Sequence, residues 1–233
     1  MGVKDTDITM DDARALVADQ ALWPIVRDFL WDFAPQVHQS WVDGVAGISG
    51  FSGVSGSSRI KAHILSELGV EPCFHVFPKD DWSRLLLLDG RTLELIVKWL
   101  GAIVCADELR HVMVGATVRE LKAVLSGIYP EVFGYTAYFA KIDFQRGDAE
   151  KQSGESQNVG SRPSIVGDVV STGMSVIDLL LADVPAPLVS RFRFKLPKGL
   201  CASESLRLKQ ETCGAVVTKL LKLKFPEAYK LCC

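Results

Sequence analysis

The clearest pattern of apolar and polar positions lies between Asp89 and Gly115. Apolar residues recur there at the i, i+3, i+4 and i+7 spacing that places them on one face of a helix. Asp89 and Gly90 mark the start of the pattern, and Gly115 interrupts it. We therefore predict a long helix with one buried face, made by Leu93, Ile96, Val97, Leu100, Ile103 and Val104.

A second helix is expected between Gly115 and Pro130. Thr117 stands three residues before Glu120, and at this spacing a hydroxyl and a carboxylate form a capping box that satisfies free backbone N–H groups at a helix start. Pro130 has no N–H to donate and disfavours helix at the residue before it. The second helix should therefore begin near Thr117 and end at Pro130.

The N-terminal part predicts shorter helices. Residues 9–30 carry an apolar stripe, and Pro24 either kinks this helix or divides it near Trp23 into two short ones. Residues 58–68 predict a helix that ends at Gly69. Further on, the chain should form a short strand or an extended segment over 73–77, followed by a helix through 85–88 that Asp80 or Asp81 can cap.

The C-terminal half contains three more helical patterns, over residues 132–142, 166–181 and 203–225. Gly173 weakens the second of these helices by about 1 kcal/mol relative to alanine. Residues 191–196 alternate charged and apolar side chains, which predicts a short strand or an extended arm.

Two stretches predict exposed loops. Residues 44–58 are five triplets that each begin with glycine, and residues 145–164 are almost wholly polar. The rest is apolar enough, at 48% hydrophobic residues overall, to bury a sizeable core. We predict a mainly α protein, a single compact multi-helix domain over 1–233 with a long exposed loop and at most short strand segments. Residues 1–144 would form its main body, and 165–233 a C-terminal helical segment packed on that body.

The formal net charge of −2 argues against a nucleic-acid binder, which needs a clustered positive surface. Residues 191–233 nevertheless hold ten lysines or arginines against three glutamates, which we interpret as a solvated basic face attracted to an acidic body. An alternative is a peripheral membrane-surface protein, in which the helix over 203–225 lies on anionic lipid through Lys209, Lys219, Lys222 and Lys224.

No run of 18 apolar residues is present to span a bilayer, and the N-terminus lacks the basic and apolar regions of a signal peptide. We therefore expect a cytoplasmic protein without a transmembrane segment, whose six cysteines are reduced thiols. Cys232 and Cys233 could bind metal, accept a lipid or form intermolecular disulfides, but an incidental exposed pair is the simpler interpretation.

Asp107, Glu108 and His111 are the strongest candidates for a metal or catalytic site. Glu-x-x-His places both side chains on one helical face, as in di-iron bundles, and a metal-dependent helical enzyme is a second alternative function. Such sites need a second Glu-x-x-His and two further glutamates on facing helices, and the sequence has no second copy. A charged helix face is the better interpretation, and we predict neither enzymatic activity nor a cofactor.

Aromatic residues concentrate early in the chain, where they either fill a core or line a pocket for a partner. They are Trp23, Trp31, Phe33 and Trp41.

Three segments resemble one known family. Residues 90–125, GRTLELIVKWLGAIVCADELRHVMVGATVRELKAVL, are similar to the signature segment of the SctK (YscK) family of type III secretion systems. HQSWV at 38–42 is similar to the early His-x-Ser-Trp element of that family, and RFRFKLPKGL at 191–200 to its late Arg-Phe/Leu-Lys-Leu-Pro element. The three segments follow one another in the order expected for the family.

The resemblance implies a non-enzymatic cytoplasmic adaptor of the sorting platform. Such a protein would bridge the cytoplasmic domain of the inner-membrane ring protein SctD to the pod protein SctQ, with other platform components nearby. It would lie at the inner membrane through its protein partners. The residues inside the matching motifs that we predict to contact partners are Trp41, Asp107, Arg110 and Arg119.

Overall fold

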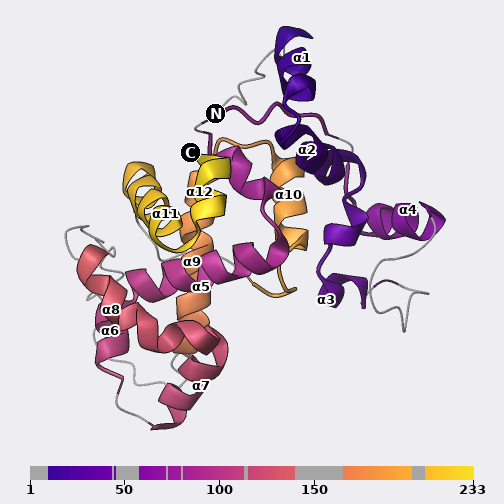
Figure 1. The fold of residues 1–233 in the computed structure, drawn as a ribbon. Coiled ribbons are helices and arrows are strands. Elements are labelled where there is room, and N and C mark those ends of the chain that lie inside the picture. The colour runs from indigo at the N-terminus through magenta and orange to yellow at the C-terminus, as the bar shows by residue number, and fades with distance from the viewer. Residues whose placement is uncertain are drawn as a thin grey trace, which may run out of the picture. The chain divides into compact units, whose positions relative to one another are not determined.

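The computed structural model describes residues 10–43, 45, 58–71, 73–79, 81–112, 115–139, 165–200 and 208–233. Within these ranges every regular element is an α-helix or a 3-10 helix, which confirms the mainly α prediction (Figure 1). The predicted loops at 44–58 and 145–164 lie outside the described residues, apart from Val45 and Ser58. The α-helices are α1 (Met10–Ala18), α2 (Leu22–Trp31), α3 (Gln39–Val42), α4 (Ser58–Glu67), α5 (Gly90–Val104), α6 (Ala106–Arg110), α7 (Gly115–Leu125), α8 (Tyr129–Phe139), α9 (Ile165–Leu180), α10 (Ala186–Phe194), α11 (Gln210–Lys224) and α12 (Pro226–Cys232). The 3-10 helices are η1 (Ala34–Gln36), η2 (Trp82–Leu87) and η3 (Ser126–Ile128).

The chain divides into two compact units, and neither unit is a continuous stretch of sequence. Unit 1 consists of Met1–Leu93, Leu181–Gly199 and Glu227–Cys233. Unit 2 consists of Glu94–Leu180 and Leu200–Pro226. Residues from the last third of the sequence therefore belong to both units. The single-domain organisation expected from the sequence stays a prediction.

Aromatic rings form the centre of unit 1. Phe29 of α2 packs edge-to-face against Phe33 and Phe77, with ring centroids 5.6 and 5.9 Å apart. All three side chains are at most 1% exposed, as are Leu85 of η2 and Phe192 of α10. Edge-to-face pairs of this kind add about 0.5–1.5 kcal/mol each beyond the area that they bury. Helices from both ends of the sequence thus share one core.

Local capping explains where the helices of unit 1 begin and end. The Asp19 carboxylate accepts hydrogen bonds from the backbone N–H groups of Ala21 and Leu22, both at 3.0 Å. The chain therefore breaks before Trp23, which confirms the alternative of two short helices, and Pro24 lies in the first turn of α2, where its missing N–H costs little.

Two further caps follow the sequence prediction. Gly69 adopts φ +64°, a conformation that glycine tolerates, and the next N–H donates to the Leu65 carbonyl at 2.9 Å, closing α4. The Asp81 carboxylate accepts from Ser83 N–H at 2.8 Å and starts η2, which is a 3-10 helix. Residues 73–77 form neither a helix nor a strand.

The predicted central helix is divided into two. Asp89 starts α5 as expected, because its carboxylate accepts the N–H and hydroxyl of Thr92 at 2.9 and 2.6 Å. The helix ends at Val104, and the short α6 continues from Ala106 to Arg110. The apolar face of α5 is buried, with Leu93, Ile96, Val97, Leu100 and Ile103 at most 3% exposed.

The predicted boundaries of the following helix were wrong at both ends. Helix α7 begins at Gly115, so Thr117 lies inside it and does not form a capping box with Glu120. The helix ends at Leu125, and Ser126 adopts φ +44° at the start of η3. Pro130 lies in the first turn of α8, where its missing N–H leaves no helical hydrogen bond unmade.

Two glycines let α5 and α9 cross closely in unit 2. A Cβ atom added to Gly101 would overlap the Val169 carbonyl oxygen, and one added to Gly173 would overlap the Val97 carbonyl oxygen. Glycine is therefore required at both positions, because any side chain would force the two backbones apart. The sequence predicted Gly173 only as a weak point of its helix.

The prediction of a strand or extended arm over 191–196 was wrong, because α10 runs to Phe194 and a turn follows. Arg191, Phe192, Lys195 and Leu196 are all at most 3% exposed. These buried positions follow the period of a helix. The strand prediction failed because it placed every charged side chain of the segment in solvent. Arg191 and Lys195 are buried instead. The basic C-terminal part is accordingly not only a solvated face.

Helix α11 lies within the predicted range 203–225 and buries one face, on which Cys213, Val216, Val217, Leu220 and Leu221 are at most 1% exposed. Its predicted first residues, 203–207, lie outside the described ones. The prediction that Cys232 and Cys233 are an exposed pair was partly wrong. Cys232 is the last residue of α12 and is only 2% exposed. Burial raises the pKa of the Cys232 thiol to about 12.

Among the described residues, none of the helices combines the length and the apolar character that crossing a membrane demands.

Candidate partner-binding surfaces

Residues 38–42 and 191–199, from two of the segments on which the family resemblance rests, lie against each other in unit 1. The indole N–H of Trp41 donates a hydrogen bond to the Leu196 carbonyl at 2.8 Å, and its ring packs edge-to-face on Phe194 with centroids 5.0 Å apart. The backbone N–H of His38 donates to the Phe194 carbonyl at 2.7 Å. Trp41 is half-buried and its polar atom is used inside the protein, so its role as a partner contact stays a prediction.

Arg191 fastens α10 to the end of α2. One guanidinium nitrogen donates to the carbonyls of Phe29 and Leu30, both at 2.7 Å, and the other donates to the Glu71 carbonyl at 2.8 Å. The last carbonyls of a helix lack partners within the helix and carry its negative dipole end. A cation buried against them therefore replaces the water that would otherwise satisfy them.

Lys195 does the same for η2, one turn further along. Its ammonium donates to the carbonyls of Leu86 and Leu88 at 2.7 and 2.8 Å and lies 4.7 Å from the centroid of the Phe29 ring. Burial lowers the pKa of Lys195 to about 7 because the charged form loses its hydration. The Arg-Phe-Arg-Phe-Lys segment thus has a structural role that sequence reasoning missed.

The other predicted contact residues are exposed on two helices of unit 2, α6 and α7. Asp107 and Arg110 form an exposed ion pair on α6, with oxygen and nitrogen 3.0 Å apart. Arg119 is exposed on α7 and donates from Nε to the Gly115 carbonyl at 3.3 Å. We call Asp107, Arg110 and Arg119 the charged face. An exposed pair of this kind contributes at most about 1 kcal/mol to stability. The role of these three residues as partner contacts stays a prediction.

Asp107, Glu108 and His111, the candidates weighed for a metal site, are not placed together as metal ligands. His111 Nδ1 lies 2.6 Å from the Asp107 carbonyl oxygen, so that ring nitrogen carries the proton and donates. Among the residues that the structure describes, no three histidine, cysteine, aspartate or glutamate side chains are placed to hold a metal ion.

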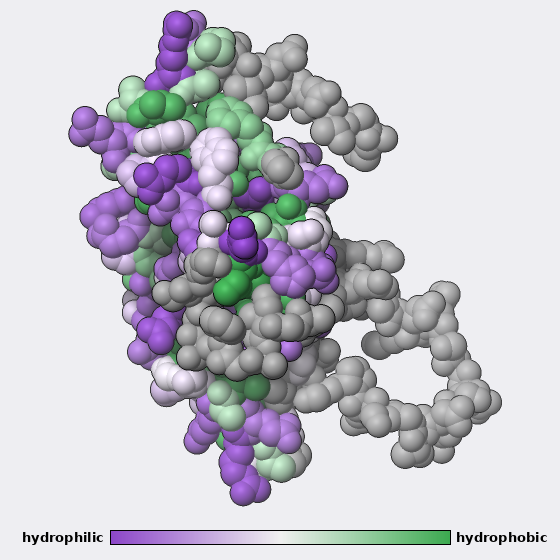
Figure 2. Space-filling model, turned by 90° about the vertical axis from the view of Figure 1, so that its right-hand side faces the viewer, coloured by the Kyte–Doolittle hydropathy of each residue, from purple (hydrophilic) through white to green (hydrophobic). Residues whose placement is uncertain are grey.

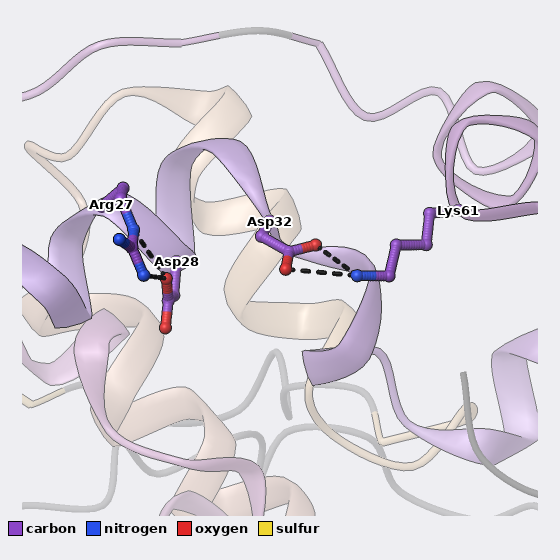
Figure 3. Close-up of polar contacts among 4 residues, drawn as sticks. All are labelled: Arg27, Asp28, Asp32 and Lys61. Atoms are coloured by element: carbon purple, nitrogen blue, oxygen red, sulfur yellow. Dashed lines mark hydrogen bonds and ion pairs between the residues drawn. The ribbon is translucent and has the colours of Figure 1, made fainter. Parts of the chain in front are cut away.

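A groove of about 340 Å³ opens on unit 1 between the end of α2 and α4. Trp31, Asp32 and Ala34 line one wall, and Ser58, Lys61, Ala62 and Leu65 line the other. The Lys61 ammonium lies 2.9 and 3.2 Å from the two Asp32 carboxylate oxygens, so an ion pair joins the walls. Figure 3 shows this pair and, separately, the pair that Arg27 and Asp28 make with each other on α2.

An aromatic cluster continues from this groove. Trp31 is 56% exposed and packs against Trp23 and Phe74, with ring centroids 5.7 and 6.1 Å away. Phe33, in contrast, is in the core. The early aromatic residues therefore differ in environment, because Phe33 fills the core whereas Trp31 lines the groove. A partner pocket at Trp31 stays a prediction. Apolar residues also reach the surface elsewhere, in patches that hydrophilic side chains interrupt (Figure 2).

The YscK family model, described as "YOP proteins translocation protein K (YscK)", matches residues 33–232. The chain belongs to the YscK family. It is therefore a type III secretion system protein. Neither the curated proteins nor the solved structures include a match to the chain.

The family match includes Trp41, the buried cations and the charged face, but it begins after Trp31 and Asp32. Sequence reasoning singled out Trp31 as one of several aromatics, and it gave no reason to select Asp32 or Lys61. The groove arises because α4 packs beside η1, which no local pattern encodes. For the buried cations a signal did exist, since Arg191, Phe192, Lys195 and Leu196 have helical spacing.

Proposed function

We propose that this YscK-family protein is a non-enzymatic adaptor that bridges the cytoplasmic domain of an SctD-like inner-membrane ring protein to an SctQ-like pod protein. The family match over residues 33–232 carries the proposal. The division into two compact units supports it, because each unit exposes a surface of its own. The protein would stay in the cytoplasm and reach the membrane only through its partners.

The chemistry of the two surfaces favours one assignment. The charged face of unit 2 suits the ring protein, because exposed charges on α6 and α7 give polar complementarity and speed association. Unit 1 suits the pod protein, because an exposed tryptophan beside a groove lined partly by apolar residues is typical of a binding hot spot. Trp41, with its N–H already bonded to Leu196, would act by holding unit 1 in shape.

Co-purification tests the bridging role directly. The tagged chain is expressed with the SctQ-like and SctD-like proteins from the same genome, singly and together, in moderate salt with reducing agent. Recovery of both partners in one complex is expected. If the chain is folded and monodisperse yet recovers neither partner, the adaptor function is wrong.

Charge reversal tests the charged face. Arg110→Glu and Arg119→Glu should weaken binding of the ring protein about tenfold or more while the pod protein still binds, because like charges would then face each other. Lys230→Glu is the matched control, since Lys230 also forms an exposed i,i+3 pair, with Glu227 on α12 in unit 1. Full ring-protein binding by both arginine variants would remove Arg110 and Arg119 from the interface.

The membrane-surface alternative is less well supported by α11. Lys219 donates to the Tyr138 carbonyl and lies 5.3 Å from the Phe139 ring centroid. Lys224 pairs with Glu131 and lies 3.9 Å from the Tyr135 ring centroid. Two of the four lysines assigned to lipid binding are thus used inside unit 2, which lowers the positive charge available to a membrane.

A further inference from the structure

The groove between α2 and α4 has the physical character of a site that a partner covers. Trp31 leaves 56% of its surface in water although two other aromatic rings lie beside it. Large aromatic side chains at the edge of a concave surface dominate binding energies when a partner excludes water from them. Ala34, Ala62 and Leu65 give the groove an apolar lining.

The two walls carry opposite charges. Asp32 lies on the α2 side and Lys61 on the α4 side, and their side chains are 54% and 29% exposed. An ion pair this exposed is worth at most about 1 kcal/mol, so an incoming partner can exchange it for pairs of its own. The geometry therefore favours an occupant that has a positive group toward Asp32 and a negative group toward Lys61.

Helical residues line the groove except for Asp32, which directly follows α2. The described residues offer no strand edge to which an extended peptide could add. An extended peptide therefore has no strand edge with which to pair at the groove. An amphipathic helix, in contrast, needs only an apolar channel with polar rims. A volume of about 340 Å³ is at the small end of the range for binding pockets. It suits a few apolar anchors on one helix face.

We propose that the groove formed by Trp31, Asp32, Ala34, Lys61, Ala62 and Leu65 binds one amphipathic helix of the pod protein. The helix inserts a large apolar side chain against Trp31 and Leu65. A basic residue on one flank meets Asp32, and an acidic residue on the other flank meets Lys61. This assignment rests on the proposed adaptor function and deepens it.

Two variants separate the apolar and the charged parts of the proposal. Trp31→Ala should weaken binding of the purified SctQ-like protein about thirtyfold, the loss expected at a hot spot. The exchange Asp32→Lys with Lys61→Asp keeps an internal ion pair but reverses both rims, so it should weaken pod binding about tenfold without changing the thermal midpoint. Titration calorimetry measures the affinities.

The chain offers a matched control for the exchange. Arg27 and Asp28 form an exposed pair on the same helix, outside the groove lining. Exchanging them, Arg27→Asp with Asp28→Arg, should leave the pod affinity unchanged. All variants should bind the SctD-like ring domain as the wild type does, which shows that unit 2 is intact.

The possible outcomes separate the inference from the proposed function. Wild-type affinity for the pod protein in both groove variants overturns the groove assignment but leaves the adaptor function standing. Failure of the unmodified chain to bind either partner overturns both. If Trp31→Ala converts a dimer of the isolated chain into a monomer without weakening pod binding, the occupant is a second copy and the proposal is wrong.

A photo-crosslinker in place of Ala62 identifies the occupant. Crosslinked peptides should come from a single helix of the SctQ-like protein that carries basic and acidic residues on opposite flanks of an apolar stripe. The same crosslinker in place of the exposed Glu227 on α12 is the control. Crosslinks from position 62 to a segment that is not helical, or to no pod peptide, contradict the proposal.

Discussion

At the scale of single residues, the protein depends on cations that serve as helix caps. Arg191 and Lys195 are among the few buried charged residues of the described chain, and each donates to backbone carbonyls. A buried charge costs several kcal/mol unless hydrogen bonds replace its hydration. Here the acceptors are carbonyls at the ends of α2 and η2. The same hydrogen bonds therefore replace the hydration of the buried charge and satisfy the carbonyls at the helix ends.

Lys195 should make stability depend on pH. Burial lowers its pKa to about 7, whereas the pKa of a lysine in an unfolded chain is about 10.4. Between these values the unfolded chain binds a proton that the native chain lacks, so the free energy of unfolding rises with pH, by up to about 1.4 kcal/mol per unit. Below about pH 7 both states are protonated, and the contribution is constant.

Urea unfolding between pH 7 and 9 tests this expectation. The stability of the wild type relative to Lys195→Met should increase over that range, because methionine cannot titrate. The neutral amine still has two N–H groups for the carbonyls of Leu86 and Leu88, so the fold needs no rearrangement. Lys230→Met, at an exposed position, should run parallel to the wild type. A parallel curve for Lys195→Met would show that Lys195 stays charged.

At the scale of elements, helix packing in unit 2 depends on the crossing of α5 and α9. Gly101 and Gly173 each face a carbonyl of the other helix with no room for a Cβ atom. Protein interiors are packed too densely to absorb such an overlap without moving backbone. Glycine has a low intrinsic helix propensity, but at these two positions it allows the backbones of α5 and α9 to pack in direct contact, which outweighs that disadvantage.

Gly173→Ala should therefore destabilise the protein by about 2–3 kcal/mol or more, in the range of severe overpacking. Gly167 provides the control on the same helix, since a Cβ atom there meets nothing within 4 Å. Gly167→Ala should be neutral or stabilising by up to about 1 kcal/mol, as helix propensity predicts. Thermal and urea unfolding measure both variants, and equal effects of the two would exclude a tight crossing.

At the scale of the whole molecule, each unit is assembled from segments that are distant in the sequence. Unit 1 needs α10, which supplies Phe192 and both buried cations, and unit 2 needs α9 and α11. The division of the sequence into a body over 1–144 and a C-terminal segment over 165–233 follows composition, whereas the two compact units combine residues from both parts.

A fragment of residues 1–144 should accordingly fail to unfold cooperatively on its own. Its cores would expose apolar surface, and the carbonyls of Phe29, Leu30, Leu86 and Leu88 would lose their donors. Adding the 165–233 fragment in equimolar amount should restore the cooperative transition, followed by circular dichroism in urea. Cooperative unfolding of 1–144 alone would mean that the body folds independently.

Local sequence determined most of the helices and several of their ends. The 3.6-residue period identified the buried face of α5 and the helical ranges that became α9 and α11, because burial of one apolar stripe is encoded within a single helix. The caps at Gly69, Asp81 and Asp89 could be found because the capping group and the backbone that it satisfies are close in sequence. The three family segments are likewise continuous stretches of residues, so the sequence alone was enough to recognise them.

Tertiary structure alone decided the features whose two halves are far apart in the chain. The carbonyls that accept from Arg191 lie 120 to 162 positions away, so a rule that places charged residues in solvent predicted a strand where there is a helix. Gly173 became essential only through Val97, and the groove exists only because α4 packs beside η1. Local propensity is encoded along the chain, but steric fit and the availability of hydrogen-bond acceptors depend on which segments meet.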